Sequence, residues 1–249
     1  MKFNKFILGI CALALLTVFS SCDDDDNVTR LDSDVSFQFD YSFADQEFAY
    51  DQVFDLGGTA VSFQTVQFYV GGIKLHPEEG DAISLEDKYL LVKPTSGAQE
   101  ITTLDKKHYH MGEFFIGVSP EDNDQTSEDF DMRDPATDPL ARQNDPPMNW
   151  NWNAGYLFVR IDGMVDLDGD GTPETVLEYH LGRDEFLRNV SITLHTDVTE
   201  DEQAIVFDFD VAALFNGIDV SQEYSMHTGD APAVAAIFAD NIPGAISKK

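Results

Sequence analysis

Hydrophobic and polar residues alternate with a period of two over much of the chain. Val35, Phe37, Phe39 and Tyr41 are separated by polar side chains, so one face of an extended segment is apolar. Similar runs occur at residues 61–75, 88–92, 113–118, 155–161, 175–180, 189–195 and 204–211. Gly, Asp and Pro residues separate these runs, as is typical of all-β domains. The pattern therefore predicts an all-β protein with a single antiparallel β-sandwich, immunoglobulin-like or jelly-roll-like.

Few segments have helical character, and one long segment has neither pattern. Short helices are expected at residues 84–90, after Asp184, at 211–215 and at 233–240. Residues 119–149 are acidic and interrupted by prolines. A loop of this length inside one domain requires a reason, which is either a functional surface or local disorder.

The N-terminal residues predict an exported, lipid-anchored protein. Lys2 and Lys5 precede an apolar run at residues 6–19, and small residues come directly before Cys22. This order is typical of a bacterial signal peptide that is removed, here residues 1–21, and the run is too short to cross a bilayer. The small residues resemble a lipoprotein cleavage motif, with Phe19 in place of its usual leucine. Cys22 would then carry the lipid.

Residues 22–33 read as an acidic tether that leads to one domain at residues 34–249. The four aspartates at 23–26 resemble the export tag of some surface-exposed bacterial lipoproteins, and the alternative is a simple solvated linker. We therefore expect an outer-membrane lipoprotein that faces the periplasm or the cell surface. The mature chain would have no cysteine pair, which excludes a disulfide framework.

Composition limits the partners of this domain. The 249 residues include 46 Asp and Glu against 15 Lys and Arg, a formal charge of -31. Removal of residues 1–21 would take away two lysines and no acid, leaving 13 basic residues and a charge of -33. Such a surface excludes nucleic acid as a partner and favours cations. The chain has no G-x-S-x-G, H-E-x-x-H or P-loop motif, so we expect a binding protein and not an enzyme. We also expect the protein to be a monomer.

An aspartate-rich stretch has the spacing of a calcium-binding loop. The candidate ligands are Asp166, Asp168, Asp170, Thr172 and Glu174. Alternating carboxylates followed by Gly171 allow a tight turn to surround one hard cation with oxygen atoms. Leu177 occupies the position where an EF-hand has its bidentate glutamate, so a structural calcium ion on a hairpin is the prediction. The alternative is an Asp/Gly-rich turn without metal.

Both tryptophans of the chain, Trp150 and Trp152, lie two residues apart. In an extended segment their side chains project to the same side. The simplest explanation for this pair is an aromatic anchor that closes one end of the sandwich.

Several short motifs occur in the order found in the MbnP-like family. They are FYVGGIKL at 68–75, FFIGV at 114–118, the Asp-Pro, Met and WxW-x-x-GY block at 145–156, and YHLG at 179–182. The chain resembles this family, named for a periplasmic copper-binding protein encoded beside methanobactin genes, over most of its mature domain. The resemblance implies a β-sandwich that binds copper. It also implies that a tryptophan is oxidised to kynurenine in some members by a partner dihaem cytochrome c peroxidase.

Matching the motifs residue by residue assigns candidate roles. Trp150 and Trp152 are the candidates for the modification, and His180, in the YHLG motif, is a candidate copper ligand. His227 is similar to the histidine before the last helix of the family. The aspartate loop is expected in only some members.

Copper chemistry adds further candidates, because imidazole and thioether groups both suit this metal. His195 lies on the strand face opposite its apolar neighbours, and Met148 precedes the tryptophan pair. His108 and His110 share one strand face and could chelate, although they follow two lysines. Met111 and Met226 are further thioethers. The alternative for each histidine is a structural hydrogen bond, and for each methionine a place in the core.

Two functions remain open from the sequence. The first is copper acquisition, storage or handling by an extracytoplasmic lipoprotein with a structural calcium loop. The second is a calcium-stabilised adhesion or ligand-recognition module that uses the tryptophan pair and the acidic segment as its contact surface. Glycan recognition requires an exposed Trp150 or Trp152, whereas copper binding requires these side chains near histidine.

Overall fold

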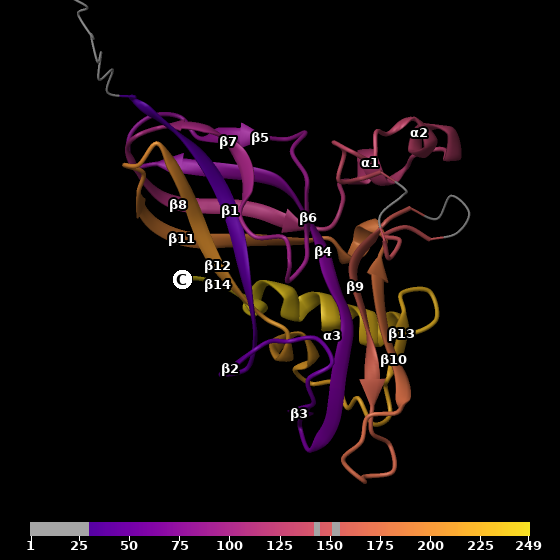
Figure 1. Cartoon of the computed structure of the whole chain (residues 1–249). Helices are drawn as coiled ribbons and strands as arrows, with labels where there is room; N and C mark the ends of the chain where they lie inside the picture. Colours follow the sequence, from indigo (N-terminus) through magenta and orange to yellow (C-terminus); the bar gives the residue numbers. More distant parts are fainter. Residues whose placement is uncertain (1–29, 142–144, 151–154) are drawn as a thin grey trace, which may run out of the picture. The chain divides into compact units, whose positions relative to one another are not determined.

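β1 (Asp32–Phe43) shows how the alternating pattern folds. Val35, Phe37 and Phe39 are at most 5% exposed, whereas the polar residues between them lie on the opposite face. The computed structural model describes residues 30–141, 145–150 and 155–249 (Figure 1). The other strands of the smaller sheet are β12 (Glu202–Asp210), β14 (Ile246–Lys248), β7 (Gln99–Asp105) and β2 (Gln46–Glu47).

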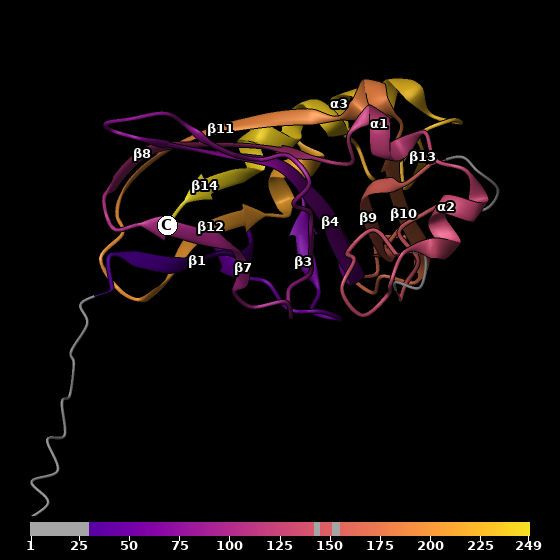
Figure 2. The same ribbon diagram turned by 90° about the horizontal axis from the view of Figure 1, so that it is seen from above.

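The larger sheet has nine strands among the described residues. Its main path is β11 (Arg188–Asp197), β8 (His108–Ile116), β4 (Thr59–Pro77), β9 (Leu157–Val165), β10 (Thr175–Gly182) and β13 (Ser225–His227). Three short strands pair with β4: β3 (Phe54–Leu56), β5 (Ile83–Leu85) and β6 (Leu90–Val92). Figure 2 shows β8 and β11 on the opposite side of the molecule from β1 and β12.

β4 joins the two halves of the larger sheet. Its 19 residues pair with β9 up to Phe68 and with β8 from Val70 onward, and the register with β8 shifts after Gly71. A Cβ atom on Gly71 would lie 2.4 Å from the Tyr89 ring and 2.6 Å from the Phe115 ring, and Gly72 has a φ of +57°. Glycine therefore allows the strand to change its pairing at a point covered by aromatic rings.

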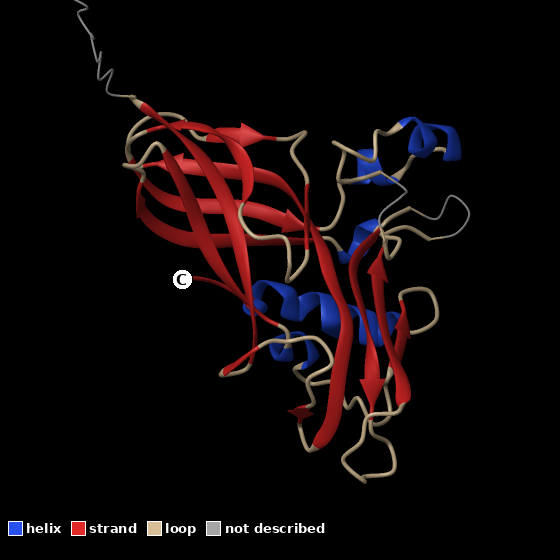
Figure 3. Ribbon diagram, viewed as in Figure 1, coloured by secondary structure: helices blue, strands red, loops and turns tan. Residues whose placement is uncertain are grey.

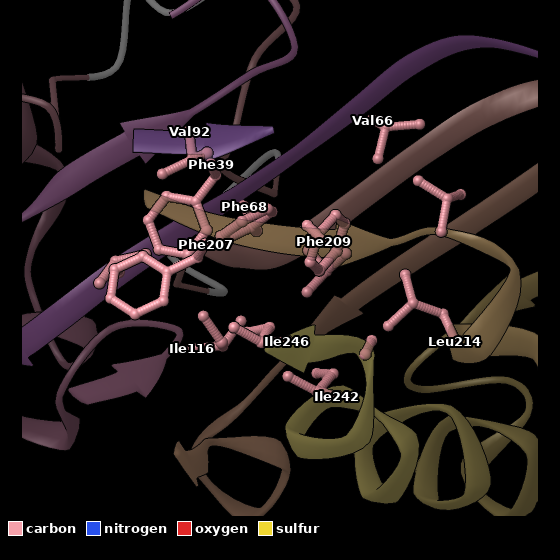
Figure 4. Packing of buried hydrophobic residues seen from close by; sticks show 14 of the residues in the cluster. Phe39, Val66, Phe68, Val92, Ile116, Phe207, Phe209, Leu214, Ile242 and Ile246 are labelled. Atoms are coloured by element: carbon pink, nitrogen blue, oxygen red, sulfur yellow. The ribbon is translucent and has the colours of Figure 1, made fainter. Parts of the chain in front are cut away.

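Phenylalanine rings fill the space between the sheets (Figure 4). Phe39 stacks on Phe207 with ring centroids 5.0 Å apart, and it meets Phe68 of the larger sheet edge to face at 5.4 Å. Phe68 in turn lies 4.4 Å from Phe209. Burial of each such side chain stabilises the fold by roughly 1.5–3 kcal/mol. This core confirms the predicted all-β sandwich.

The strand directions differ from the expected antiparallel arrangement. β1 pairs with β12 in parallel, and β10 pairs with β13 in parallel. Parallel neighbours need long connections, and each of these pairs joins segments with other elements between them. The sheets are therefore mixed.

Three of the four expected helices are confirmed, and one is wrong. The confirmed helices are η1 (Asp184–Phe186), η2 (Ala212–Phe215) and α3 (Pro232–Asn241), which is followed by η3 (Ile242–Ala245). Residues 84–90 are not helical, because Ser84 pairs with Lys74 in the β4–β5 ladder and a turn then leads to β6. Figure 3 shows how few and short the helices are beside the strands.

The acidic segment expected as a long loop contains two short helices, α1 (Pro120–Asn123) and α2 (Ser127–Met132). Ser119 and Thr126 cap them, and Phe130 and Leu140 are buried in a second apolar cluster. The Tyr156 hydroxyl donates a 2.8 Å hydrogen bond to the Leu140 carbonyl. The described part of this segment is therefore packed against β9 and β4, which contribute Leu157, Phe158 and Tyr69 to the same cluster.

The N-terminal predictions fall on residues 1–29, which lie outside the described residues. They include the signal peptide, Cys22 and the aspartates at 23–26; Trp152 also lies outside. Leu31–Lys249 forms one compact unit. No helix in the described part of the chain is both long enough and apolar enough to cross a membrane.

Candidate metal centre

His180 on β10 and His227 on β13 lie side by side. They are register partners in the parallel pair, so their side chains project from the same face of the sheet. Their ring centroids are 4.8 Å apart. The neighbouring residues Tyr179 and Met226 are fully buried on the opposite, core-facing side. The strand pattern therefore fixes both imidazoles on the outer face, and His180 is nevertheless only 8% exposed.

Trp150 covers the two imidazoles. Its indole lies 6.2 Å from the His180 ring and 5.9 Å from the His227 ring, measured between centroids. A Cβ atom on Gly182 would lie 2.8 Å from the indole nitrogen and 2.6 Å from the Tyr156 carbonyl oxygen. The glycine of the YHLG motif thus makes room for the indole beside the end of β10.

Two polar side chains of the larger sheet hold the segment that carries Trp150. The Gln67 amide donates a 3.1 Å hydrogen bond to the Pro146 carbonyl, and Gln67 is 1% exposed. The Arg160 guanidinium donates a 2.8 Å bond to the Pro147 carbonyl. Trp150 itself donates through its backbone N–H to the Gly155 carbonyl at 3.1 Å. The bonds from Gln67 and Arg160 tie the segment to β4 and β9.

A carboxylate orients His180. Asp162 Oδ1 lies 2.7 Å from His180 Nε2, and Asp162 Oδ2 accepts a 2.7 Å bond from Arg160 Nε. Burial raises the pKa of Asp162, but the bonds from His180 and Arg160 lower it more, so the pKa lies below its ordinary value. Asp162 is therefore ionised at neutral pH and acts as an acceptor, which places the His180 proton on Nε2. His180 Nδ1 then offers its lone pair to a metal.

His227 has a similar but looser arrangement. Its Nε2 atom lies 3.5 Å from Oε2 of Glu178, which is the cross-strand partner of Asp162. Ligand atoms of Asp162, Glu178 and His180 all lie within 4.8 Å of one another. Each histidine is therefore paired with its own carboxylate, an arrangement common around metal-bound imidazoles.

Thr228 links the two strands at the site. It is fully buried, and its hydroxyl donates to the His180 carbonyl at 3.0 Å and accepts from the Gly182 N–H at 2.9 Å. These bonds keep the end of β10 aligned with β13.

A cavity of about 520 Å³ opens in front of these side chains. It is lined by Pro147, Asn149, Trp150, Leu157, Arg160, His180, Arg183, His227, Gly229 and Asp230. Its size suits a metal ion together with a small ligand or water molecules. Two imidazoles and one indole line it, and the carboxylates of Asp162 and Glu178 lie beside the imidazoles. These groups fit the chemistry of copper, for which imidazole is a suitable ligand.

The aspartate loop lies between β9 and β10. Ligand atoms of Asp166, Asp168 and Asp170 are within 4.8 Å of one another. Asp166 accepts bonds from the N–H groups of Gly169 at 2.8 Å and Gly171 at 2.7 Å, and the Gly171 bond is the main cause of its lowered pKa. The clustered carboxylates fit a hard cation.

Two further predicted ligands of this loop are exposed. The Thr172 N–H donates to Asp170 at 2.8 Å, and the Glu174 N–H donates to the Val165 carbonyl at 3.3 Å. The loop is separate from the histidine pair, because His180 lies five residues along β10 from Thr175, roughly 16 Å at the rise of a strand.

The structure does not bring His195 or Met148 to the histidine pocket. His195 lies on β11, which β8, β4 and β9 separate from β10, so strand spacing alone separates the two positions by roughly 19 Å. β8 and β9 also pair with different parts of β4, which adds a separation along the strands. Met148 is 1% exposed and packs in the second apolar cluster. Met226 is in the main core, and the Met111 sulfur accepts a bond from the Ser191 hydroxyl at 3.6 Å.

Sequence reasoning missed Asp162, Arg160 and Thr228. Arg160 and Asp162 are polar residues two apart in the otherwise apolar strand β9, and this parity places both on the face of His180. That signal was present, but in a chain with 46 acidic residues a single carboxylate is not distinctive.

Comparisons with known proteins identify the family and the fold of the chain. A family model described as MbnP matches residues 32–229. The structure is similar to that of MbnP from Methylosinus trichosporium, with a TM-score of 0.52 and 17% sequence identity, over 82% of this chain and 87% of the other. At this identity the structural likeness shows a shared fold. A search of curated protein sequences finds no match.

Proposed function

Because the chain belongs to the MbnP family, we propose that it is an extracytoplasmic protein that binds copper for acquisition, storage or handling. The observation that carries this proposal is the convergence of His180, His227 and Trp150, which are far apart in the sequence, around one cavity. We assign the role of a binding protein and not of an enzyme.

His180 and His227 would hold the copper ion through imidazole nitrogen. Support comes from the 2.7 Å contact between His180 Nε2 and Asp162, which leaves Nδ1 for a metal. Glu178 has the corresponding position beside His227. The low exposure of His180 limits competition from water.

Trp150 is the tryptophan that we propose for oxidation to kynurenine, with a dihaem cytochrome c peroxidase as the partner. Its ring faces both histidines, so a change in its chemistry would act directly on the copper environment. Mass spectrometry of the peptide that contains Trp150 and Trp152, from native cells that possess the peroxidase, tests this assignment. Fragment ions that place kynurenine at Trp150 would support it, and unmodified Trp150 would contradict it.

The remaining features of the proposal concern calcium and location. Asp166, Asp168 and Asp170 would bind one structural calcium ion between β9 and β10. The sequence before residue 30 supports a lipoprotein anchored through Cys22 in the outer membrane, and we propose a monomer.

The adhesion alternative receives less support. A stacking platform for glycans needs an exposed aromatic face, whereas Trp150 is half-buried and lies against two imidazoles. The position of Trp150 therefore favours copper.

Copper titration of the purified protein and of the variants His180→Ala and His227→Ala tests the function. Each variant is expected to lose most of the affinity of this pocket and to keep its fold, because both side chains lie on the outer face of the sheet. His195→Ala is the matched control, since His195 is exposed on another strand. Unchanged affinity in both pocket variants would contradict the proposal.

A further inference from the structure

Four of the six histidines lie away from the pocket, on or beside β8. His76 is on β4, His108 and His110 are on β8, and His195 is on β11. Tyr109 and Gly112 face the core, so His108 and His110 belong to the outer face of the sheet. This second group of imidazoles is not explained by the copper pocket or by the core.

Irregular pairing brings His76 and His110 together. His76 pairs with Met111 and Pro77 with Tyr109, so His110 is an extra residue in β8. In such a bulge, both His110 and Met111 face the single residue opposite. The rings of His76 and His110 have centroids 6.1 Å apart and are tilted by 57°. Two imidazoles that share one ion have ring centres roughly 5–6 Å apart, given metal–nitrogen bonds of about 2.0 Å.

Glu113 adds a carboxylate to this pair. Its Oε2 atom lies 3.1 Å from His76 Nε2, and its side chain is 40% exposed. Glu113 also lines a surface cavity of about 460 Å³ with Lys74, Glu86 and Ser191, which leaves its carboxylate open to solvent. The donor set is therefore two imidazoles and one carboxylate, with space for water.

His110 has an unsatisfied nitrogen. Its Nδ1 atom is buried and has no hydrogen-bond partner among the described residues. A buried polar atom in this state costs about 1–3 kcal/mol. A rotation of the ring toward His76 is the adjustment that coordination requires, and an ion would supply the missing partner.

The charges around the site are mixed, with Lys74 directly opposite Glu113 in the β4–β8 ladder. Lys106 and Lys107, which precede the histidines, are held in ion pairs with Asp201 at 2.5 Å and Asp105 at 3.4 Å. Their charges are thus partly compensated, and the chain as a whole is strongly negative.

From these observations we propose a second transition-metal site on the outer face of the larger sheet, formed by His76, His110 and Glu113. Two imidazoles and one carboxylate with open positions suit a divalent ion of the copper and zinc class. This site is independent of the pocket at His180 and His227. It would give the protein a capacity of more than one transition-metal ion.

Copper(II) titration in excess calcium tests the site, with the purified His180→Ala/His227→Ala protein as the starting variant. One bound ion with nitrogen couplings in its electron paramagnetic resonance spectrum is expected to remain. Adding His76→Ala and His110→Ala should abolish that signal, and adding Glu113→Gln should weaken binding about 10-fold. Thermal melts show whether each variant is folded.

The matched control is His108→Ala/His195→Ala in the same starting variant. These two rings are 5.8 Å apart and His108 contacts Asp197 at 2.7 Å, so they resemble the proposed pair in composition. Retention of the ion in the control supports His76 and His110. Loss of the ion in the control, or its retention without His76 and His110, would overturn the proposal. A failure of the pocket assignment would appear separately, as unchanged stoichiometry in the starting variant relative to the natural protein.

Discussion

Nε2 of His180 lies 2.7 Å from Oδ1 of Asp162, and the two residues are diagonal neighbours on one face of the β9–β10 pair, where His180 is directly opposite Arg160. The carboxylate holds the imidazole in one orientation and one tautomer. Asp162 therefore has a positioning role in the proposed copper pocket, although it was not distinguishable among the many acids of the sequence.

Replacing Asp162 with asparagine is expected to lower copper affinity while His180 remains. Loss of a carboxylate that orients a metal-bound histidine typically costs about 10–100-fold in affinity. Competition titration with a copper chelator measures the change, and exposed Glu47→Gln is the control. Equal affinities for Asp162→Asn and the natural protein would show that the contact has no role in binding.

The lowered pKa of Asp162 predicts that its contribution to the free energy of unfolding depends on pH. The folded protein holds the pKa of Asp162 below its ordinary value of 3.8, so its contribution is present above that pH and is lost as the pH falls through the lower, folded value. The difference in unfolding free energy between the natural protein and Asp162→Asn should therefore be largest near neutrality and shrink below about pH 4. Urea unfolding at pH 7 and pH 3 measures it. A difference that grows in acid would contradict the assigned direction.

Gly182→Ala is expected to displace the indole of Trp150. The added Cβ would lie within 3 Å of both the indole nitrogen and the Tyr156 carbonyl, and overpacking of this kind costs roughly 1–3 kcal/mol. In a Trp152→Phe background, Trp150 is the one remaining tryptophan. Copper should quench its fluorescence less when Gly182→Ala is added than when Gly182 is kept. Gly244→Ala is the control, because nothing lies within 4 Å of its added Cβ. Equal quenching in both variants would mean that Gly182 does not position the indole.

Calcium is expected to raise the melting temperature through the aspartate loop. A ligand present at 100 times its dissociation constant stabilises the folded state enough to shift a domain of this size by about 5–10 °C. Asp168→Asn should remove most of the shift, whereas the exposed Asp81→Asn should not. Scans with calcium and with chelator provide the measurement, and an identical melting temperature in both would refute the site.

Local pattern predicted the strands well but not their partners. The alternation around Phe37 and Phe39 correctly identified β1, yet nothing near β1 in the sequence indicates that it pairs in parallel with β12, more than 150 residues away. Likewise, the sequence around Ser84 and Leu85 is compatible with a helix, but these residues are extended because they pair with β4. Pairing depends on contacts that periodicity does not contain.

The candidate site was predicted only in part, because local patterns do not show which strands become neighbours. His180, His227 and Trp150 were named from short motifs, and the structure brings them together. His195 was named from strand parity alone, which gives a face of the sheet but not a position within it. Met148 was named from its neighbours in the sequence, although its apolar side chain packs in the second cluster.

The register between β10 and β13 has a consequence for the order of assembly. His180 and His227 meet only when β13, which begins at Ser225, has joined the edge of the larger sheet. A chain that ends before β13 could form most of the sandwich strands and still present a single imidazole beside Trp150. Metal capture by this pocket would therefore report that nearly the entire chain has reached its folded state.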